Sequence, residues 1–219
     1  YTNLFKTKIM IFDFDGVIID STKIKIEEYR NLFSQFTKNK TTLNEITNIY
    51  KNSAGIPRET TLKKVFKEVL AINISNHEVD NLSLDFSKQI FRRLEAIEPL
   101  KGFLEYLAIH KKINKHIISG APNSDVTYLI KKLNLSKYFK SIQGGPLNKK
   151  NELIHISKLT KVKAKDIVYF GDQKNDCIAA KSAGVGFIGI NAGSNLDTMK
   201  CKQFPDFEKL IAYEIAGRL

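Results

Sequence analysis

Residues 8–21 read KIMIFDFDGVIIDS, and this stretch decides the fold. It begins as a short apolar run that ends in an acid, which is the pattern of a buried β-strand. Asp13 and Asp15 follow two residues apart, so they point to the same side if the strand continues. Two carboxylates that lie so near each other repel one another unless a cation or a proton lies between them. The stretch therefore predicts a strand that carries acidic side chains to a site.

Beyond this strand the hydrophobic pattern changes. Between residues 21 and 97, apolar side chains recur at spacings of three and four, as in amphipathic helices. After residue 97, helices of this kind alternate with short apolar runs at 116–119, 141–143, 167–170 and 185–190. Such alternation is typical of a parallel, doubly wound sheet. We predict an α/β core at residues 1–20 and 98–219, with a helical insert at residues 21–97.

Length and composition narrow the class of protein. The chain has 219 residues, 42% of them hydrophobic and 26% charged, which suits one core with a smaller insert. Its longest apolar runs fall well short of the roughly 20 residues of a membrane span, and no charged-then-apolar leader opens the chain. Cys177 and Cys201 form neither a disulfide framework nor a zinc pattern. We therefore expect a cytoplasmic protein with reduced thiols.

The net charge of +12 raises the question of an anionic partner. Lysine is spread along the whole chain, without a block of five or more basic residues and without basic-aromatic interleaving. This distribution disfavours nucleic acid or a membrane as the main partner. It favours a positive field that attracts phosphorylated metabolites. The oligomeric state stays open.

Polar residues stand where the predicted strands end. The second strand ends at Ser119-Gly120, the fourth ends at Gly171-Asp172, and Asp176 follows one helical turn later. Lys149 and Lys150 precede a predicted helix. Each residue alone could be a helix cap or a turn, but ligands bind at the carboxyl ends of parallel strands, and these residues gather there. Several carboxylates at one edge make a hard-oxygen site for Mg²⁺, and a hydroxyl with flexible backbone suits an anion.

In these residues the chain resembles the haloacid dehalogenase-like hydrolase superfamily. The run DFDGVIIDS at 13–21 is similar to the family's first motif, and Ser119 in IISGAP to its second. Lys150 corresponds to the third motif; it is preferred to Lys149, the alternative, because Leu153 and Ile154 follow it at the spacing usual in the family's helix. Gly171-Asp172 together with Asp176 correspond to the fourth motif. The resemblance covers the whole chain and implies a Rossmann-like core. The insert resembles the helical cap of the phosphoglycolate phosphatase and β-phosphoglucomutase branch.

The resemblance implies a role for each residue. Asp13 would attack phosphorus to form an aspartyl-phosphate, and Asp15 would serve as general acid and then as general base. Mg²⁺ would be held by the Asp13 carboxylate, the Asp15 carbonyl and Asp172, with Asp176 orienting a metal-bound water or the lysine. The phosphoryl oxygens would be held by Ser119, Gly120 and Lys150. Family members that cleave carbon–halogen bonds lack the second acid, so Asp15 disfavours dehalogenation.

The resemblance also implies a substrate contact in the insert. Residues 55–59, GIPRE, are similar to the cap loop whose arginine, here Arg58, meets the substrate; otherwise they are a turn that opens a helix. We expect a Mg²⁺-dependent phosphomonoesterase for a small phosphorylated metabolite, such as a sugar phosphate or a phosphoglycolate-like compound. Two alternatives stay open. One is a phosphomutase of the β-phosphoglucomutase type, and the other is a non-catalytic regulatory protein on the same fold.

Overall fold

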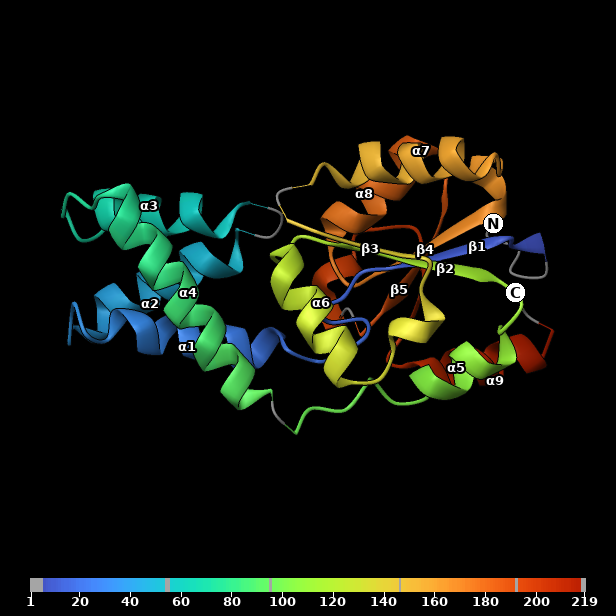
Figure 1. Ribbon diagram of the computed structural model, residues 1–219, viewed down its shortest axis with the longest axis horizontal. Helices are drawn as coiled ribbons and strands as arrows, with labels where there is room; N and C mark the ends of the chain where they lie inside the picture. Colours follow the sequence, from blue (N-terminus) through green and yellow to red (C-terminus); the bar gives the residue numbers. More distant parts are fainter. Residues whose placement is uncertain (1–5, 54–55, 95, 146, 192, 218–219) are drawn as a thin grey trace. The chain divides into compact units, whose positions relative to one another are not determined.

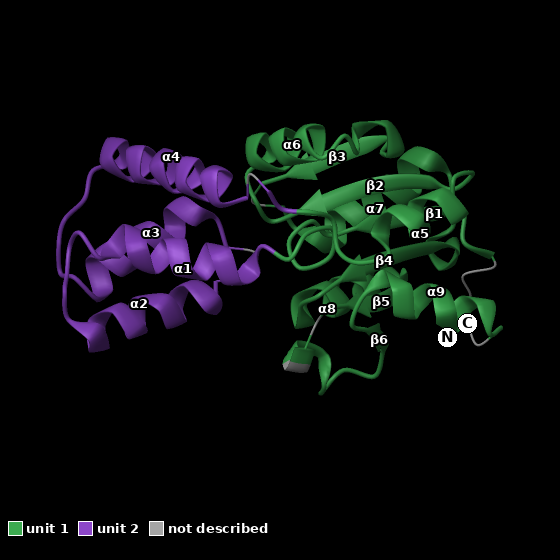
Figure 2. Ribbon diagram, turned by 90° about the horizontal axis from the view of Figure 1, so that it is seen from below, with its two compact units in different colours: residues 1–20, 98–219 green, residues 21–97 purple. Residues whose placement is uncertain are grey.

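The computed structural model describes residues 6–53, 56–94, 96–145, 147–191 and 193–217 (Figure 1). The chain divides into two compact units, residues 1–20 with 98–219 and residues 21–97 (Figure 2). Each unit packs around its own apolar and aromatic side chains. No helix within the described ranges combines the length and the apolar character that crossing a membrane requires.

A six-stranded sheet forms the centre of the larger unit. Its strands are β1 (Ile9–Phe12), β2 (Asn114–Ser119), β3 (Ser141–Gly144), β4 (Ile167–Gly171), β5 (Gly186–Ile190) and β6 (Lys202–Phe204). They lie in the order β3-β2-β1-β4-β5-β6, and every neighbouring pair is parallel. The strand order reverses at β1, which creates a topological switch point where ligands bind in open α/β sheets. The predicted doubly wound parallel sheet is confirmed.

Helices cover both faces of the sheet. On one face lie α7 (Lys149–Thr160) and α8 (Lys174–Ala183), and on the other lie α5 (Phe103–Ile109) and α9 (Phe207–Ile215) (Figure 1). Because both faces are covered, β1 and β4 are buried at every position and read as continuous apolar runs. The remaining helices of this unit are α6 (Asn123–Lys132), η2 (Ser136–Tyr138), η3 (Ala164–Asp166) and η4 (Gly193–Leu196).

The smaller unit contains α1 (Thr22–Phe33), α2 (Lys40–Lys51), α3 (Arg58–Glu68) and α4 (Asn76–Arg93). The last of these begins with a capping box, in which Ser75 and Glu78 satisfy each other's backbone N–H groups. Inside the unit, the ring of Tyr29 stacks on Tyr50 at 4.1 Å and meets Phe86 edge-on at 5.5 Å. The predicted helical insert after the first strand is confirmed.

The structure adds elements that the sequence patterns did not separate. Helix α2 lies within the region predicted as helical but was not distinguished there. Strand β6 has three residues, too few for a periodic signal. Helix α9 reads FEKLIAYEI, and its buried Phe207 and Leu210 have the three-residue spacing that could have indicated a helix.

Candidate active site

Three acidic side chains gather where β1 and β4 end. Phe12 pairs with Phe170, so Asp13 and Asp172 follow the two strands at nearly the same level. Asp176 lies in the first turn of α8. One carboxylate oxygen of each acid lies within 4.8 Å of the others, and the residues are only 5%, 5% and 0% exposed. The sheet edge therefore holds a buried acidic cluster, made of Asp13, Asp172 and Asp176.

Asp15 lies beside this cluster in a turn. The strand ends at Phe12, whereas Asp15 bridges to Ile19 and the N–H of Gly16 donates to the carbonyl of Ile19 at 2.8 Å. Asp15 is half-buried, and its charge contributes to raising the pKa of Asp13. Strand β1 therefore does not continue through Asp15, which was the condition for Asp13 and Asp15 to point to the same side. The two acids still interact through their charges.

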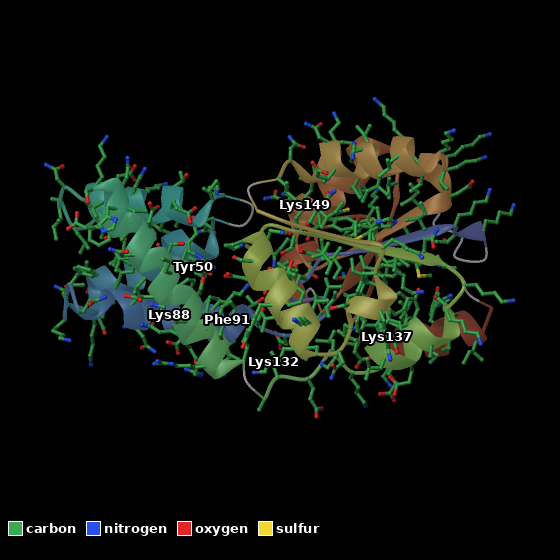
Figure 3. The ribbon with its side chains drawn as sticks, viewed as in Figure 1. Tyr50, Lys88, Phe91, Lys132, Lys137 and Lys149 are labelled. Carbon is green, nitrogen blue, oxygen red and sulfur yellow. The ribbon has the colours of Figure 1, made fainter. Side chains whose placement is uncertain are left out.

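Lys149, labelled in Figure 3, neutralises part of the acidic cluster. Its Nζ lies 2.6 Å from Asp13 Oδ2 and 2.5 Å from Asp176 Oδ1. It is the first residue of α7, which begins after Asn148, whose side chain accepts a hydrogen bond from the N–H of Asn151. A lysine here therefore joins strand β1 to helix α8 through two carboxylates.

The contacts in the structure favour Lys149 over Lys150, the lysine preferred from the sequence. Lys150 is exposed, and Lys149 makes the contacts with the acids. The reason is the face of α7 that is buried: Leu153 and Ile156 pack in the core, and Lys149 precedes them at helical spacings of four and seven. One residue further along a helix is turned by about 100°, which directs Lys150 elsewhere.

The carboxylate of Asp176 accepts hydrogen bonds from three protein donors. Besides Lys149, Oδ1 accepts a hydrogen bond from the hydroxyl of Tyr169 at 3.1 Å, and Oδ2 accepts one from the backbone N–H of Gln173 at 3.1 Å. The side chain of Gln173 also donates to Asp172 Oδ2 at 2.5 Å. Sequence reasoning missed Tyr169 and Gln173. The one available signal was a tyrosine within the otherwise apolar run of β4.

Burial and the charges of neighbouring acids strongly raise the pKa values of Asp13 and Asp172. Burial raises the pKa of Asp13 to about 7, with Lys149 opposing the shift and Asp176 adding to it. Burial, together with the charges of Asp13 and Asp176, raises the pKa of Asp172 to about 8. Burial alone would lower the pKa of Lys149, but the charges of Asp13 and Asp176 outweigh it and hold that pKa well above its ordinary value.

The charges in the cluster do not balance. Three buried carboxylates face one ammonium, so the ionised cluster needs further positive charge. Its donors are hard carboxylate oxygens, which suit Mg²⁺ more than a soft metal. The chemistry of the residues present therefore fits the divalent cation expected from the sequence.

Two glycines let the acids approach one another. Gly16 has φ +78°, and a Cβ there would lie 2.5 Å from Asp172 Oδ2. A Cβ on Gly171 would lie 2.5 Å from the Cβ of Asp176. Both distances are shorter than van der Waals contact allows, so each glycine leaves space that an acid of the cluster occupies.

Ser119 is the last residue of β2, the neighbour of β1, and Gly120 follows it. Ser119 is 1% exposed, and its Oγ accepts a hydrogen bond from the N–H of Ala121 at 3.1 Å. This contact uses an acceptor position of the hydroxyl and keeps its proton for another partner. Gly120 is exposed. Both residues lie at the sheet edge that carries Asp13, because β1 and β2 are parallel and in register.

Arg58 is engaged inside the helical unit. It begins α3, and its Nη1 donates to Ser87 Oγ at 2.6 Å and to the carbonyl of Ser83 at 3.0 Å, both on α4. Its guanidinium also lies 4.9 Å from the ring centroid of Phe86. These contacts tie α3 to α4. Gly55 of the predicted cap loop lies outside the described residues, and the substrate contact of Arg58 stays a prediction.

The chain matches a known family over most of its length. The model of the family described as haloacid dehalogenase-like hydrolase matches residues 10–190. The chain belongs to this family. The predicted family and the predicted enzyme class are thereby confirmed for this haloacid dehalogenase-like hydrolase.

Known relatives of this hydrolase include named phosphatases. It is 24% identical over 223 residues to phosphoglycolate phosphatase of Pseudomonas fluorescens strain Pf0-1, covering 93% of this chain and 78% of the relative. It is 26% identical over 183 residues to phosphorylated carbohydrates phosphatase of Thermotoga maritima, covering 80% and 81%. The solved structure of a predicted phosphoglycolate phosphatase from Haemophilus somnus has a TM-score of 0.75 at 15% identity, covering 95% and 98%, which shows a shared fold.

Proposed function

We propose that this hydrolase is a Mg²⁺-dependent phosphomonoesterase that acts on a small phosphorylated metabolite through an aspartyl-phosphate. One observation carries the proposal. A carboxylate at the carboxyl end of β1, Asp13, contacts the ammonium of Lys149 at 2.6 Å inside a buried acidic cluster. Named phosphatases among the relatives support the reaction class and the kind of substrate.

Asp13 is suited to be the nucleophile. Its Oδ1 accepts a hydrogen bond from the N–H of Phe14 at 2.7 Å, which fixes the carboxylate. Burial raises the pKa of this carboxyl, and Lys149 opposes that rise and so favours the ionised, nucleophilic form. In the first step, an Asp13 oxygen bonds to phosphorus, and the bond from phosphorus to the leaving oxygen breaks. The leaving oxygen takes the electron pair and a proton from Asp15.

In the second step, Asp15 acts as a general base. It accepts a proton from water while the water oxygen bonds to phosphorus. The bond between phosphorus and the Asp13 oxygen breaks, inorganic phosphate leaves, and both carboxyls return to their starting states. The turn that contains Asp15 keeps it half-buried, within reach of both water and a ligand.

The remaining residues bind and position. We assign the phosphoryl oxygens to the Ser119 hydroxyl, the Gly120 N–H and the ammonium of Lys149, which replaces Lys150 in this role. The carboxylates of Asp13 and Asp172 with the carbonyl of Asp15 would hold Mg²⁺, which supplies positive charge to the carboxylates and the phosphoryl group. Asp176 is a positioning residue, because it meets Lys149 at 2.5 Å and is itself held by Tyr169 and Gln173.

We further assign the chemistry to the α/β unit and the choice of substrate to the helical unit at residues 21–97. The site residues named above all belong to the first unit. The second unit carries Arg58, the candidate contact for a carboxylate or second phosphate.

Phosphate release from a panel of sugar phosphates, phosphoglycolate and nucleotides, with and without Mg²⁺, tests the proposal. Turnover of a small substrate that needs Mg²⁺ and Asp13 supports it. Conversion of a hexose 1-phosphate into a 6-phosphate without net phosphate release, in the presence of a bisphosphate, would favour the mutase. If the wild type and Asp13→Asn release phosphate equally, the assignment of the nucleophile is wrong.

A further inference from the structure

A hollow of about 610 Å³ lies at the amino ends of β5 and β6. Gly186 is the first residue of β5 and Lys202 the first of β6, whereas the acidic cluster lies at the carboxyl ends of β1 and β4. The two features therefore occupy opposite edges of one sheet, separated by about 15 Å, the length of a five-residue strand. The proposed phosphatase reaction makes no use of this hollow.

The lining of the hollow is strongly basic. Four of its nine lining residues are lysines and none is acidic, although Lys and Arg together make up only 35 of the 219 residues of the chain. These lysines are Lys165, Lys181, Lys200 and Lys202. We call this feature the lysine pocket.

The lysines come from separate segments of the chain. Lys165 lies in η3, Lys181 in the last turn of α8, and Lys202 on β6, where its Nζ lies 4.9 Å from the ring centroid of Tyr213. Asp166, the acid next to Lys165, pairs with Lys8 at 3.7 Å. Four like charges around one hollow repel one another, and an anion that meets several of them relieves that repulsion.

A second hollow shows that basic lining is not general in this Lys-rich chain. It has about 510 Å³, lies within the helical unit, and is lined by one lysine, one glutamate and otherwise uncharged residues. The lining of the lysine pocket therefore has a local excess of positive charge, which the high lysine content of the chain does not by itself explain.

We propose that the lysine pocket binds a polyphosphate chain, either alone or as part of a nucleotide. Three linked phosphates present several negative charges in one small ligand, which matches several ammonium groups better than a single phosphate does. The buried Val185 and Phe187 add an apolar part to the lining, against which the base of a nucleotide can pack. The site is distinct from the acidic cluster and does not depend on the proposed reaction.

Calorimetric titration of the full chain with tripolyphosphate, ATP and orthophosphate, in metal-free buffer, tests this inference. Tripolyphosphate and ATP should bind, and orthophosphate should bind far more weakly. Tighter binding of ATP than of tripolyphosphate indicates that the apolar lining takes the base; equal binding indicates that the phosphate chain alone is recognised. Either result supports the pocket, whereas no binding of tripolyphosphate or ATP overturns it.

A matched pair of double variants locates the binding. The change K165E/K181E should weaken tripolyphosphate binding by about tenfold or more, since two charge-assisted contacts are lost. The control K132E/K158E alters the net charge equally, at exposed positions of α6 and α7 that do not line the pocket. Equal losses of tripolyphosphate affinity in both variants would mean that binding depends only on the net charge of the protein, and would overturn the proposed site.

Amide chemical shifts and activity complete the test. Tripolyphosphate should perturb the backbone amides of Gly184 and Gly186, which line the pocket. Perturbations confined to the residues around Asp13 would place the anion at the acidic cluster and contradict the proposal. Unchanged melting temperature and phosphatase activity in K165E/K181E show that the variant is folded; if the proposed phosphatase activity fails, the binding measurements still decide the pocket.

Discussion

Lys149 Nζ lies 2.6 Å from Asp13 Oδ2, although 136 positions separate the two residues in the chain. The first residue of α7 thereby meets the first residue after β1. The same ammonium contacts Asp176 at 2.5 Å, so one positive charge holds two acids of the cluster in place. This arrangement makes Lys149 the residue whose removal should affect both the charge and the geometry of the site.

Replacing Lys149 with methionine should reduce kcat/KM by about 10²–10³-fold, because a preorganised positive charge is lost from the buried site. The matched variant Lys150→Met should stay within about twofold of the wild type, as expected for an exposed side chain. Steady-state kinetics on one substrate at saturating Mg²⁺ measures both. A large loss in Lys150→Met with none in Lys149→Met would show that Lys150, and not Lys149, serves the site.

Asp13→Asn should lower turnover by about 10³-fold or more, equivalent to about 4 kcal/mol of transition-state stabilisation, because an amide is a poor nucleophile. Acid-quenched reactions with labelled substrate should trap a phosphoenzyme in the wild type and none in the variant. Asp20→Asn, at an exposed position near the same motif, is the control. Residual activity within about tenfold of the wild type would remove Asp13 from the role of nucleophile.

Gly16→Ala should inactivate the protein, since its Cβ would lie 2.5 Å from Asp172 Oδ2. Gly193→Ala separates the steric effect from the backbone effect, because Gly193 also has a positive φ, +52°, but nothing lies within 4 Å of its Cβ position. The control should lose about 1–2 kcal/mol of stability and keep its activity. Comparable kinetics for the two variants would show that the space beside Asp172 is unimportant.

Mg²⁺ should stabilise the folded protein. At about one hundred times its dissociation constant, a ligand of the folded state adds about 2.7 kcal/mol, which corresponds to an increase in melting temperature of about 5–10 °C for a chain of this size. Excess chelator should remove both this increase and the activity. Asp172→Asn should respond less to Mg²⁺, whereas Asp166→Asn, away from the cluster, should respond as the wild type does. Full activity in chelator would refute the metal site.

His116 should make the protein less stable in mild acid. Burial lowers its pKa from the ordinary 6.5, with the charge of Lys140 adding to the shift. Below pH 6.5 the unfolded chain therefore binds a proton that the folded chain resists, so this group destabilises the fold as pH falls. His116→Asn removes the titration while keeping a polar atom near Ser141 Oγ, which lies 2.8 Å from His116 Nδ1.

Urea denaturation of the wild type and His116→Asn at pH 7.5 and pH 5.5, both with saturating Mg²⁺, measures the effect. The wild type should lose stability relative to the variant between the two values, and the comparison at each pH cancels the other titrating groups. A matched substitution at the exposed His155 controls for the loss of an imidazole. A constant difference between wild type and His116→Asn at both pH values would exclude the mechanism.

Strands β1 and β4 were predictable from sequence because they are buried on both faces and so read as uninterrupted apolar runs. The choice between Lys149 and Lys150 was not, because it depends on which face of α7 meets the core and where the Asn148 cap starts the helix. The position of Asp15 depends on the turn after β1. The contact of Tyr169 with Asp176 depends on how β4 meets α8, which the alternation of residues along one strand does not reveal.

The acidic cluster and its lysine come from residues 13, 149, 172 and 176, so the site spans most of the chain. During synthesis, Asp13 leaves the ribosome long before Lys149 and Asp176 exist. A nascent chain that ends at residue 97 already contains the complete helical unit but only the first strand of the sheet. The complete acidic cluster with its lysine can form only after α8 has emerged. Hydrolysis therefore requires a chain that extends through α8, and fragments truncated before α8 should be released as inert products.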